Sequence, residues 1–342
     1  MLLKIKHFWF FQLSFIGILS LSTLGFSKTI IRLGTLAPQG SSWYLTLKQM
    51  GQKWAQAPDG GVRLIVYPSG ILGDESDMIQ KMRIGQIQAC LLTVAGLSSI
   101  DRSAFVLATP MMYRSYSELN FVLNHMKPYL KKRFLKKGFV ILNWGNAGWI
   151  RFFGKKPIAT PADLKKMNFF IWAGDNRALS LWQSAGFHPV PLAATDIMPG
   201  LQTGLINSFD TTPLTALSFQ WFALAHYMTD LKFAPLVGAT IMTLKAWDSI
   251  PPEDRPAILH AAHQAGIQFI NSIKKEDHEA IHVMKKKGLK VVHLTAAQKS
   301  SWESLFLKAY PKMIGQLFPV QAFQKAIIYR TQYRKLHPTP IN

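Results

Sequence analysis

Strand and helix signals alternate through the N-terminal part of the chain, and this alternation restricts the fold more than any other feature. Thr29–Leu36 is rich in β-formers, Trp43–Ala55 has apolar residues at helical spacing, and Val62–Tyr67 is again strand-like. An amphipathic helix over Asp74–Ile84 and a buried strand over Gln88–Val94 complete the pattern. A β-α-β-α-β order predicts a mostly parallel sheet with helices on its faces.

A second alternating set follows in the middle of the chain. Gly148–Ala173 is typical of a strand, a turn, a short helix that begins at Thr160-Pro161, and a second strand. Helical and strand-like segments continue to Asp210. The longest helical pattern, Pro252–Lys287, exceeds the mean helix length of about 11–12 residues several times over. A helix of that length could cross two α/β lobes.

The first 27 residues are typical of a secretory signal peptide. Lys4 and Lys6 precede the apolar run Phe8–Phe26, which contains no acid, and small residues up to Ser27 fit a cleavage site. An uncleaved membrane anchor is the alternative, because the apolar run is long. We therefore expect a periplasmic protein that is secreted through a cleaved signal.

Charge and cysteine content exclude several classes of protein. The net charge is +21, which suggests nucleic acid as a first partner, but the lysines and arginines are scattered along an exported chain. We therefore expect no nucleic-acid partner, only a basic surface suited to an anionic envelope. Cys90 is the only cysteine and lies in an apolar run, so it predicts a buried thiol and no disulfide framework.

One motif points to an enzyme. His278-Glu279-Ala280-Ile281-His282 matches H-E-x-x-H, and Glu303 could serve as a third ligand, so an exported zinc metallohydrolase is an alternative function. Lysines before and after the motif oppose a bound cation and favour a solvated helix face. The chain has no G-x-S-x-G, P-loop or G-x-G-x-x-G motif, and we expect no cofactor.

Six segments resemble one protein family and occur in its order. They are LGTLAPQGSSWY (33–44), VYPSGILGDESDMIQKMRIGQI (66–87), ATPMMYRSYSELNFVL (108–123), KKPIATPADLKKM (155–167), GLQTGLINSFDTTPL (200–214) and SIPPEDRPAI (249–258). Together they resemble the DctP-type solute-binding proteins of tripartite ATP-independent periplasmic (TRAP) transporters. The resemblance covers nearly the whole mature chain, from about Ile30 to Leu307.

The resemblance implies a two-lobed α/β fold, each lobe with a mixed, mostly parallel sheet, joined by a hinge and a long spanning helix. It implies a lobe I of 28–147 plus 236–275, a lobe II of 148–235 plus 276–330, and a flexible basic tail over 331–342. It also implies a protein that is not an enzyme. Such a protein closes on a small organic ligand and delivers it to the membrane permease subunits of an ion-gradient-driven transporter.

The chain departs from the family where the family binds carboxylates. Typical members have an arginine, which pairs with the ligand carboxylate, at the position of Phe170, and a second arginine at Ile150. Arg151 is one residue along the strand and should point to the opposite face. An uncompensated carboxylate beside Phe170 would cost several kcal/mol. The departures predict a hydrophobic or aromatic solute, which could be a monocarboxylate. In this respect the chain resembles a subfamily with apolar pockets, and that resemblance implies a TPR-repeat periplasmic protein as a partner.

The candidate ligand-binding residues combine aromatic side chains for stacking with polar groups for orientation. They are Trp43, Asp74, Glu75, Trp149, Arg151, Phe170, Trp172, Asp210 and Thr212. A third possibility is an envelope scaffold that has kept the fold and lost ligand binding.

Overall fold

In the computed structural model, which describes residues 29–58 and 61–338, one sheet runs through the molecule in the order β2-β1-β3-β9-β4-β7-β5-β6. Its strands are β1 (Thr29–Thr35), β2 (Val62–Tyr67), β3 (Ala89–Thr93), β4 (Phe139–Gly154), β5 (Asn168–Trp172), β6 (His188–Leu192), β7 (Ser208–Thr211) and β9 (Ala234–Thr243). Off this path β8 (Tyr227–Thr229) pairs with β4 and with β10 (Lys290–Val292).

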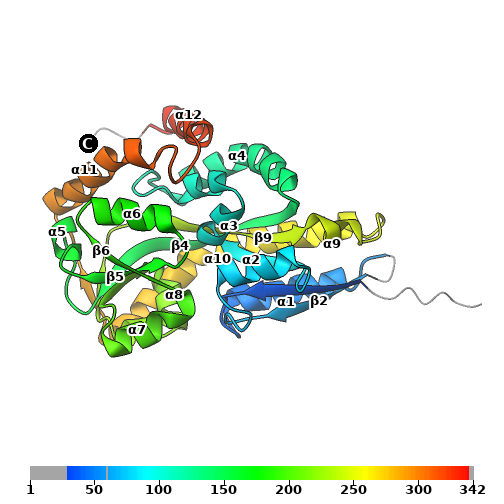
Figure 1. Ribbon diagram of the computed structural model, residues 1–342, viewed down its shortest axis with the longest axis horizontal. Coiled ribbons are helices and arrows are strands. Elements are labelled where there is room, and N and C mark those ends of the chain that lie inside the picture. The colour runs from blue at the N-terminus through cyan, green and yellow to red at the C-terminus, as the bar shows by residue number, and fades with distance from the viewer. Residues whose placement is uncertain (1–28, 59–60, 339–342) are drawn as a thin grey trace, which may run out of the picture.

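The long strand β4 divides the molecule into two halves (Figure 1). On one side β2, β1 and β3 pair in parallel, and β9 runs antiparallel between β3 and β4. On the other side β7 is antiparallel to β4, whereas β5 is parallel to both β6 and β7. The observed sheet is therefore mixed, as expected, and both halves are built around it. The proposed lobe boundary at 147/148 falls inside β4.

Helices cover both faces of the sheet. They are α1 (Ser42–Trp54), α2 (Glu75–Arg83), α3 (Val94–Ile100), α4 (Tyr116–Lys136), α5 (Pro161–Leu164), α6 (Asn176–Ser184), α7 (Ile197–Thr203), α8 (Pro213–Ser218), α9 (Leu244–Asp248), α10 (Arg255–Lys286), α11 (Ala296–Met313) and α12 (Val320–Leu336). Short 3-10 turns occur at η1 (Arg102–Ala108), η2 (Ala194–Asp196) and η3 (Trp221–Ala223). In Figure 1, α5, α6, α7 and α11 lie in one half and α1, α2 and α9 in the other.

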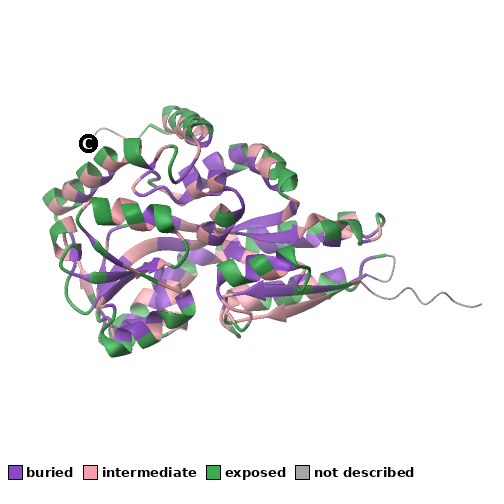
Figure 2. Ribbon diagram, viewed as in Figure 1, coloured by how far each residue is buried: buried purple, intermediate pink, exposed green. Residues whose placement is uncertain are grey.

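The helix α10 braces both halves, as its length predicted. Its first part packs in one core with α1, where Ile258 and Phe269 contact the cluster of Leu47 and Trp54. Near its other end, Met284 belongs to the core of the second half, together with residues of β7 and α7. Figure 2 shows buried residues concentrated along the strands and on the inward sides of the helices.

The C-terminal region differs from the flexible tail expected over 331–342. Residues 331–336 belong to α12, which packs against α4 and η1. Arg334 Nε donates to Glu118 Oε1 at 2.6 Å, and the Glu118 side chain is only 2% exposed. A carboxylate buried this deeply needs a cationic partner, and that requirement orders the end of the chain. The last four residues of the tail lie outside the described residues.

Other predictions have mixed outcomes. Cys90 is a buried free thiol, as expected. The pattern gave no sign of β9, α3 or α12. The predicted signal peptide lies outside the described residues. Among the described residues, no helix is both long enough and apolar enough to span a bilayer.

Candidate ligand-binding site

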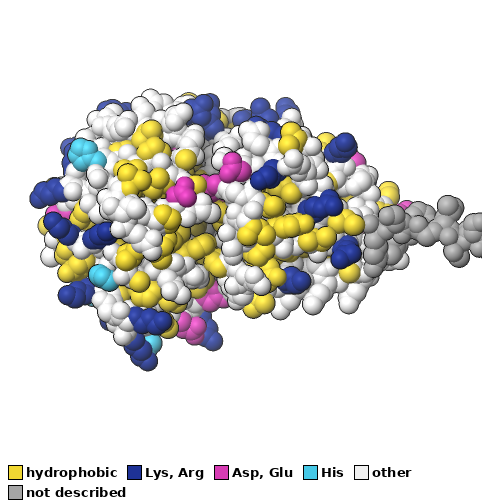
Figure 3. Space-filling view, turned by 60° about the horizontal axis from the view of Figure 1, so that its bottom comes forward, with side chains coloured by type: hydrophobic (Ala, Val, Ile, Leu, Met, Phe, Trp, Pro, Cys, Tyr) yellow, Lys and Arg dark blue, Asp and Glu magenta, His cyan; other side chains and the backbone are white. Residues whose placement is uncertain are grey.

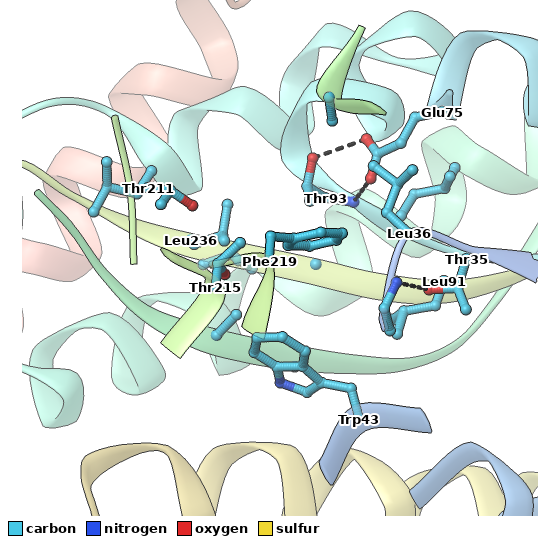
Figure 4. A pocket seen from close by; sticks show the side chains of 18 of the residues that line it. Thr35, Leu36, Trp43, Glu75, Leu91, Thr93, Thr211, Thr215, Phe219 and Leu236 are labelled. Atoms are coloured by element: carbon cyan, nitrogen blue, oxygen red, sulfur yellow. Dashed lines mark hydrogen bonds between the residues drawn. The ribbon is translucent and has the colours of Figure 1, made fainter. Parts of the chain in front are cut away.

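A cavity of about 150 Å³ lies where the two halves of the molecule meet (Figure 4). Its walls come from the loop after β1, from α1, α2 and β3 in one half, and from β5, β7 and the segment after α8 in the other. The central strands β4 and β9 contribute Gly145, Ile150 and Gly238. The cavity therefore forms only when both halves of the chain are folded and in contact.

Aromatic side chains form much of the wall. Trp43 reaches in from the first turn of α1 (Figure 4), where Ser41 caps the helix by accepting a hydrogen bond from Tyr44 N. Phe219 lies above Trp43 in the same view, and its ring stacks on Trp221 with 4.7 Å between the ring centroids. Phe170 and Trp172 line the wall from β5, with their rings edge to face at 5.6 Å. Such rings supply large, rigid apolar contact area.

Glu75 is the most deeply buried acid of the wall. It begins α2 and is only 2% exposed. Its carboxyl accepts hydrogen bonds from Thr93 N at 2.6 Å, Thr93 Oγ1 at 2.8 Å and Gly96 N at 2.8 Å. A Cβ at Gly96 would lie 2.5 Å from Oε2 of Glu75, so only glycine allows this approach. Burial raises the pKa of Glu75 to about 7, against the lowering effect of its hydrogen bonds.

Asp210 is the second acid of the wall. It is partly buried on β7, opposite Phe152 of β4. In the described part of the chain, no other residue donates a hydrogen bond to its carboxyl. Burial raises the pKa of Asp210 to about 7. Burial thus favours the protonated form of both acids of the wall.

No lysine, arginine or histidine is among the described residues that line this cavity. Phe170 and Ile150 occupy the two positions where the resemblance leads one to expect arginine, and both side chains are in the wall. The site therefore has no guanidinium group with which to pair a carboxylate.

Five of the nine predicted ligand-binding residues line the cavity. They are Trp43, Glu75, Phe170, Trp172 and Asp210. The other four, Asp74, Trp149, Arg151 and Thr212, lie next to the site and have other contacts. The role of all nine residues in ligand binding stays a prediction.

Asp74 and Thr212 cap helices at the edge of the site. Asp74 Oδ1 accepts from Glu75 N at 2.8 Å, and Asp74 Oδ2 accepts from Ala194 N at 3.3 Å, so this carboxyl connects the two halves. Burial raises its pKa. Thr212 is the N-cap of α8, and it holds the lining residue Thr215 through a hydroxyl contact of 2.8 Å.

Trp149 and Arg151 lie outside the cavity wall, on the β4 strand. The Trp149 ring is buried 5.5 Å from Tyr116. The Arg151 Nε atom is buried without a hydrogen-bond partner, and burial lowers the pKa of its guanidinium. The negative charges that favour the charged form of Arg151 are those of Asp277 and Asp230, and neither residue lines the cavity. Arg151 thus does not replace the missing arginines, in agreement with the alternation of side chains along a strand.

Comparisons with known proteins settle the family. A family model described as bacterial extracellular solute-binding protein, family 7 (DctP), matches residues 33–316. The chain belongs to this family. It is a TRAP-type solute-binding protein, and members of the family bind small organic solutes outside the cytoplasm and work with membrane permeases.

Individual relatives are distant. The C4-dicarboxylate-binding periplasmic protein DctP of Rhodobacter capsulatus is 23% identical over 264 residues, 76% of this chain and 78% of that protein. The 2,3-diketo-L-gulonate-binding periplasmic protein YiaO of Escherichia coli K12 is 22% identical over 282 residues, 81% and 84% of the two chains. A TRAP solute-binding protein from Ralstonia eutropha with bound (S)-2-acetolactate has a TM-score of 0.82 at 21% identity, covering 90% of this chain and all of that one. At this identity the structure supports the two-lobed fold alone.

Sequence reasoning missed two aromatic residues of this DctP-type site. Phe219 and Trp221 line the cavity directly after α8. A signal was present, because both follow the segment GLQTGLINSFDTTPL that carries the resemblance. Phe219 and Trp221 are far from Trp43 in the sequence, so the sequence did not indicate that all three line one cavity.

The zinc-hydrolase alternative finds no support. His278, Glu279 and His282 are exposed on α10, away from the residues that line the cavity. Lys275 Nζ lies 3.8 Å from Glu279 Oε1 in an exposed pair. Within residues 29–58 and 61–338, no group of three or more His, Cys, Asp or Glu side chains could hold a metal ion. These residues form a solvated helix face.

Proposed function

We propose that this TRAP solute-binding protein captures a hydrophobic or aromatic solute, with at most one carboxylate, and delivers it to an ion-gradient-driven permease. The observation that carries the proposal is the composition of the cavity wall. Its titratable groups are the two acids Glu75 and Asp210, and the rest of the wall is mainly aromatic and aliphatic. The names of the relatives give small organic acids as their ligands, whereas the described lining of this cavity has no basic group to pair with a carboxylate.

The size and chemistry of the cavity fit an apolar ring or a short apolar chain. A dry, apolar cavity of about 150 Å³ in another protein binds benzene, and this cavity has the same volume. A dicarboxylate would bring two charges into a wall that already contains two acids. Its desolvation would cost several kcal/mol per ion without a paired cation.

Closure of the halves supplies the coupling between binding and delivery. Asp74 of one half accepts from Ala194 N of the other, and the solute would lie between the same two elements, α2 and η2. A solute that contacts both halves favours the closed form by its differential contacts. We place the hinge where β4, β9 and α10 pass between lobe I (28–147 plus 236–275) and lobe II (148–235 plus 276–330).

Localisation and partners complete the proposal. A cleaved signal peptide would bring the mature chain to the periplasm, and a TPR-repeat protein would bind it there. Cross-linking in intact cells tests whether a TPR-repeat protein binds. Recovery of permease subunits alone would contradict that part of the proposal.

Substitution of Phe170 tests the solute class. We expect Phe170→Arg to weaken binding of 4-phenylbutyrate at least about tenfold in calorimetry, because a guanidinium replaces the apolar wall. Binding of succinate should improve, because a paired cation becomes available. Ile71→Arg is the matched control, since Ile71 is 65% exposed and the change adds the same charge.

Two results would contradict the proposal. One is wild-type protein that binds succinate more tightly than 4-phenylbutyrate. The other is a folded Phe170→Arg variant with unchanged affinities for both compounds.

A further inference from the structure

A second cavity of about 270 Å³ adjoins the first and is also largely apolar. Its walls come from β5, α6 and α11 in one half and from the segments after β3 in the other. Phe169, Trp182 and Phe306 are among its aromatic residues. Their rings form an edge-to-face group in which Trp182 lies 5.0 Å from Phe169 and 5.9 Å from Phe306.

The two cavities meet where strands β5 and β7 separate. These strands are registered at one residue pair only, Phe169 with Ser208. Beyond that pair the side chains of both strands border both cavities. The shared lining residues are Thr93, Ile150, Phe170, Trp172, Asp210 and Leu236. Because these six residues belong to both linings, the two cavities lie next to each other.

The charges of the two cavities differ. Acids are the only titratable groups of the first, whereas the second has Lys308 and Lys312, which are exposed on α11 and share one helix face at i, i+4. Asp175 also lines the second cavity. Its carboxyl caps α6 by accepting a hydrogen bond from Ala178 N at 3.1 Å. Burial raises the pKa of Asp175. A single anionic group is thus favoured at the α11 mouth and disfavoured beside Glu75 and Asp210.

Figure 3 shows one face of the molecule, on which basic and hydrophobic side chains both occur on both halves. No single basic patch dominates this face.

We propose that the solute is an elongated amphiphile with one anionic end: its apolar chain occupies both cavities, and its carboxylate lies at Lys308 and Lys312. This inference rests on the proposed function and assigns the orientation of the solute within the site. The carboxylate stays near water, where it keeps most of its hydration. The apolar chain fills the second cavity between β5, α6 and α11. The arrangement explains how a monocarboxylate binds in a DctP-type protein without the arginine pair.

A chain-length series on the purified full chain tests the proposal. We expect octanoate to bind at least about tenfold more tightly than butanoate, because each methylene that becomes buried can contribute up to about fourfold. The double variant Lys308→Met/Lys312→Met should weaken octanoate about three- to tenfold, and less at high salt, while octan-1-ol is unaffected. The control is Lys131→Met/Lys132→Met, which removes two exposed lysines of α4.

A second variant blocks the cavity itself. Ala178 and Ala309 line the second cavity and not the first, so Ala178→Leu/Ala309→Leu should weaken octanoate binding, because a chain anchored at Lys308 and Lys312 can no longer pass through the second cavity to the first. Circular dichroism and thermal melting confirm folding, and if this variant does not fold, the lysine variant decides alone.

The outcomes separate this inference from the proposed function. Equal affinities for butanoate and octanoate, or a lysine variant that matches its control, would overturn the elongated-solute proposal while hydrophobic binding stands. Binding of succinate in preference to every hydrophobic acid would overturn both.

Discussion

The buried carboxyl of Glu75 makes the stability of the protein depend on pH in a defined way. The perturbation is Glu75→Gln, which keeps the size of the side chain and removes its charge. Because burial raises the pKa of Glu75 from 4.5 to about 7, the folded protein holds a proton that the unfolded chain releases between those values. Stability from this group is therefore highest below pH 4.5 and falls as the pH rises toward 7.

The magnitude follows from the shift. One pKa unit corresponds to about 1.4 kcal/mol, so the whole change amounts to about 3 kcal/mol, of which about 2–3 kcal/mol falls between pH 5 and pH 8. Other buried acids add to the slope of the wild type. The difference in unfolding free energy between wild type and Glu75→Gln isolates the contribution of this one group.

Urea denaturation at several pH values measures that difference. We expect the wild type to lose about 2–3 kcal/mol relative to Glu75→Gln between pH 5 and pH 8. Glu303→Gln, at an exposed glutamate of α11, is the control and should show almost no relative change. A difference that does not vary with pH would refute the reasoning, because it would mean that Glu75 ionises as freely in the folded protein as in the unfolded chain.

Three further predictions concern the same structure. Wild-type octanoate affinity should fall as the pH rises through about 7, where Asp210 and Glu75 ionise, and Asp210→Asn should make this fall smaller, with Glu75 left to cause the rest; matching titration profiles would contradict this. Gly96→Ala should destabilise the protein by about 1–3 kcal/mol in urea denaturation, because its Cβ would lie 2.5 Å from Glu75 Oε2, and an unchanged midpoint would show that the contact relaxes freely. Arg334→Met should cost about 3 kcal/mol, because it leaves Glu118 buried without its cation, and hydrogen exchange should show faster opening of α12; wild-type exchange rates would exclude an ordering role for the pair.

Local signals were sufficient for much of the fold. Thr160-Pro161 predicted the start of α5, and the run Asn168–Trp172 predicted β5, because caps and apolar runs are written within a few residues. The strand β9 was not predicted. It contains Pro235 and Gly238, which weaken a strand pattern, yet a Cβ at Gly238 would lie 2.6 Å from the Leu92 carbonyl oxygen, so the close approach of β3 requires glycine.

Contacts between distant residues were beyond sequence reasoning. The C-terminal end of α12 depends on the pair of Arg334 with Glu118, which are 216 positions apart. The raised pKa of Glu75 depends on its burial, and Thr93 and Gly96, whose hydrogen bonds oppose that rise, lie on other elements. By contrast, the position of Arg151 outside the cavity wall was predictable, because side chains alternate along a strand.

The central claim is that a hydrophobic solute with at most one carboxylate occupies the cavity between the two halves. Mass spectrometry of the compound released when the freshly purified protein is denatured tests it most directly, with Phe170→Arg protein purified in parallel. The account predicts a compound that partitions into organic solvent, is present in stoichiometric amount with wild type, and is depleted from Phe170→Arg. Recovery of succinate, a uronate or another strongly hydrophilic acid from the wild type would contradict it.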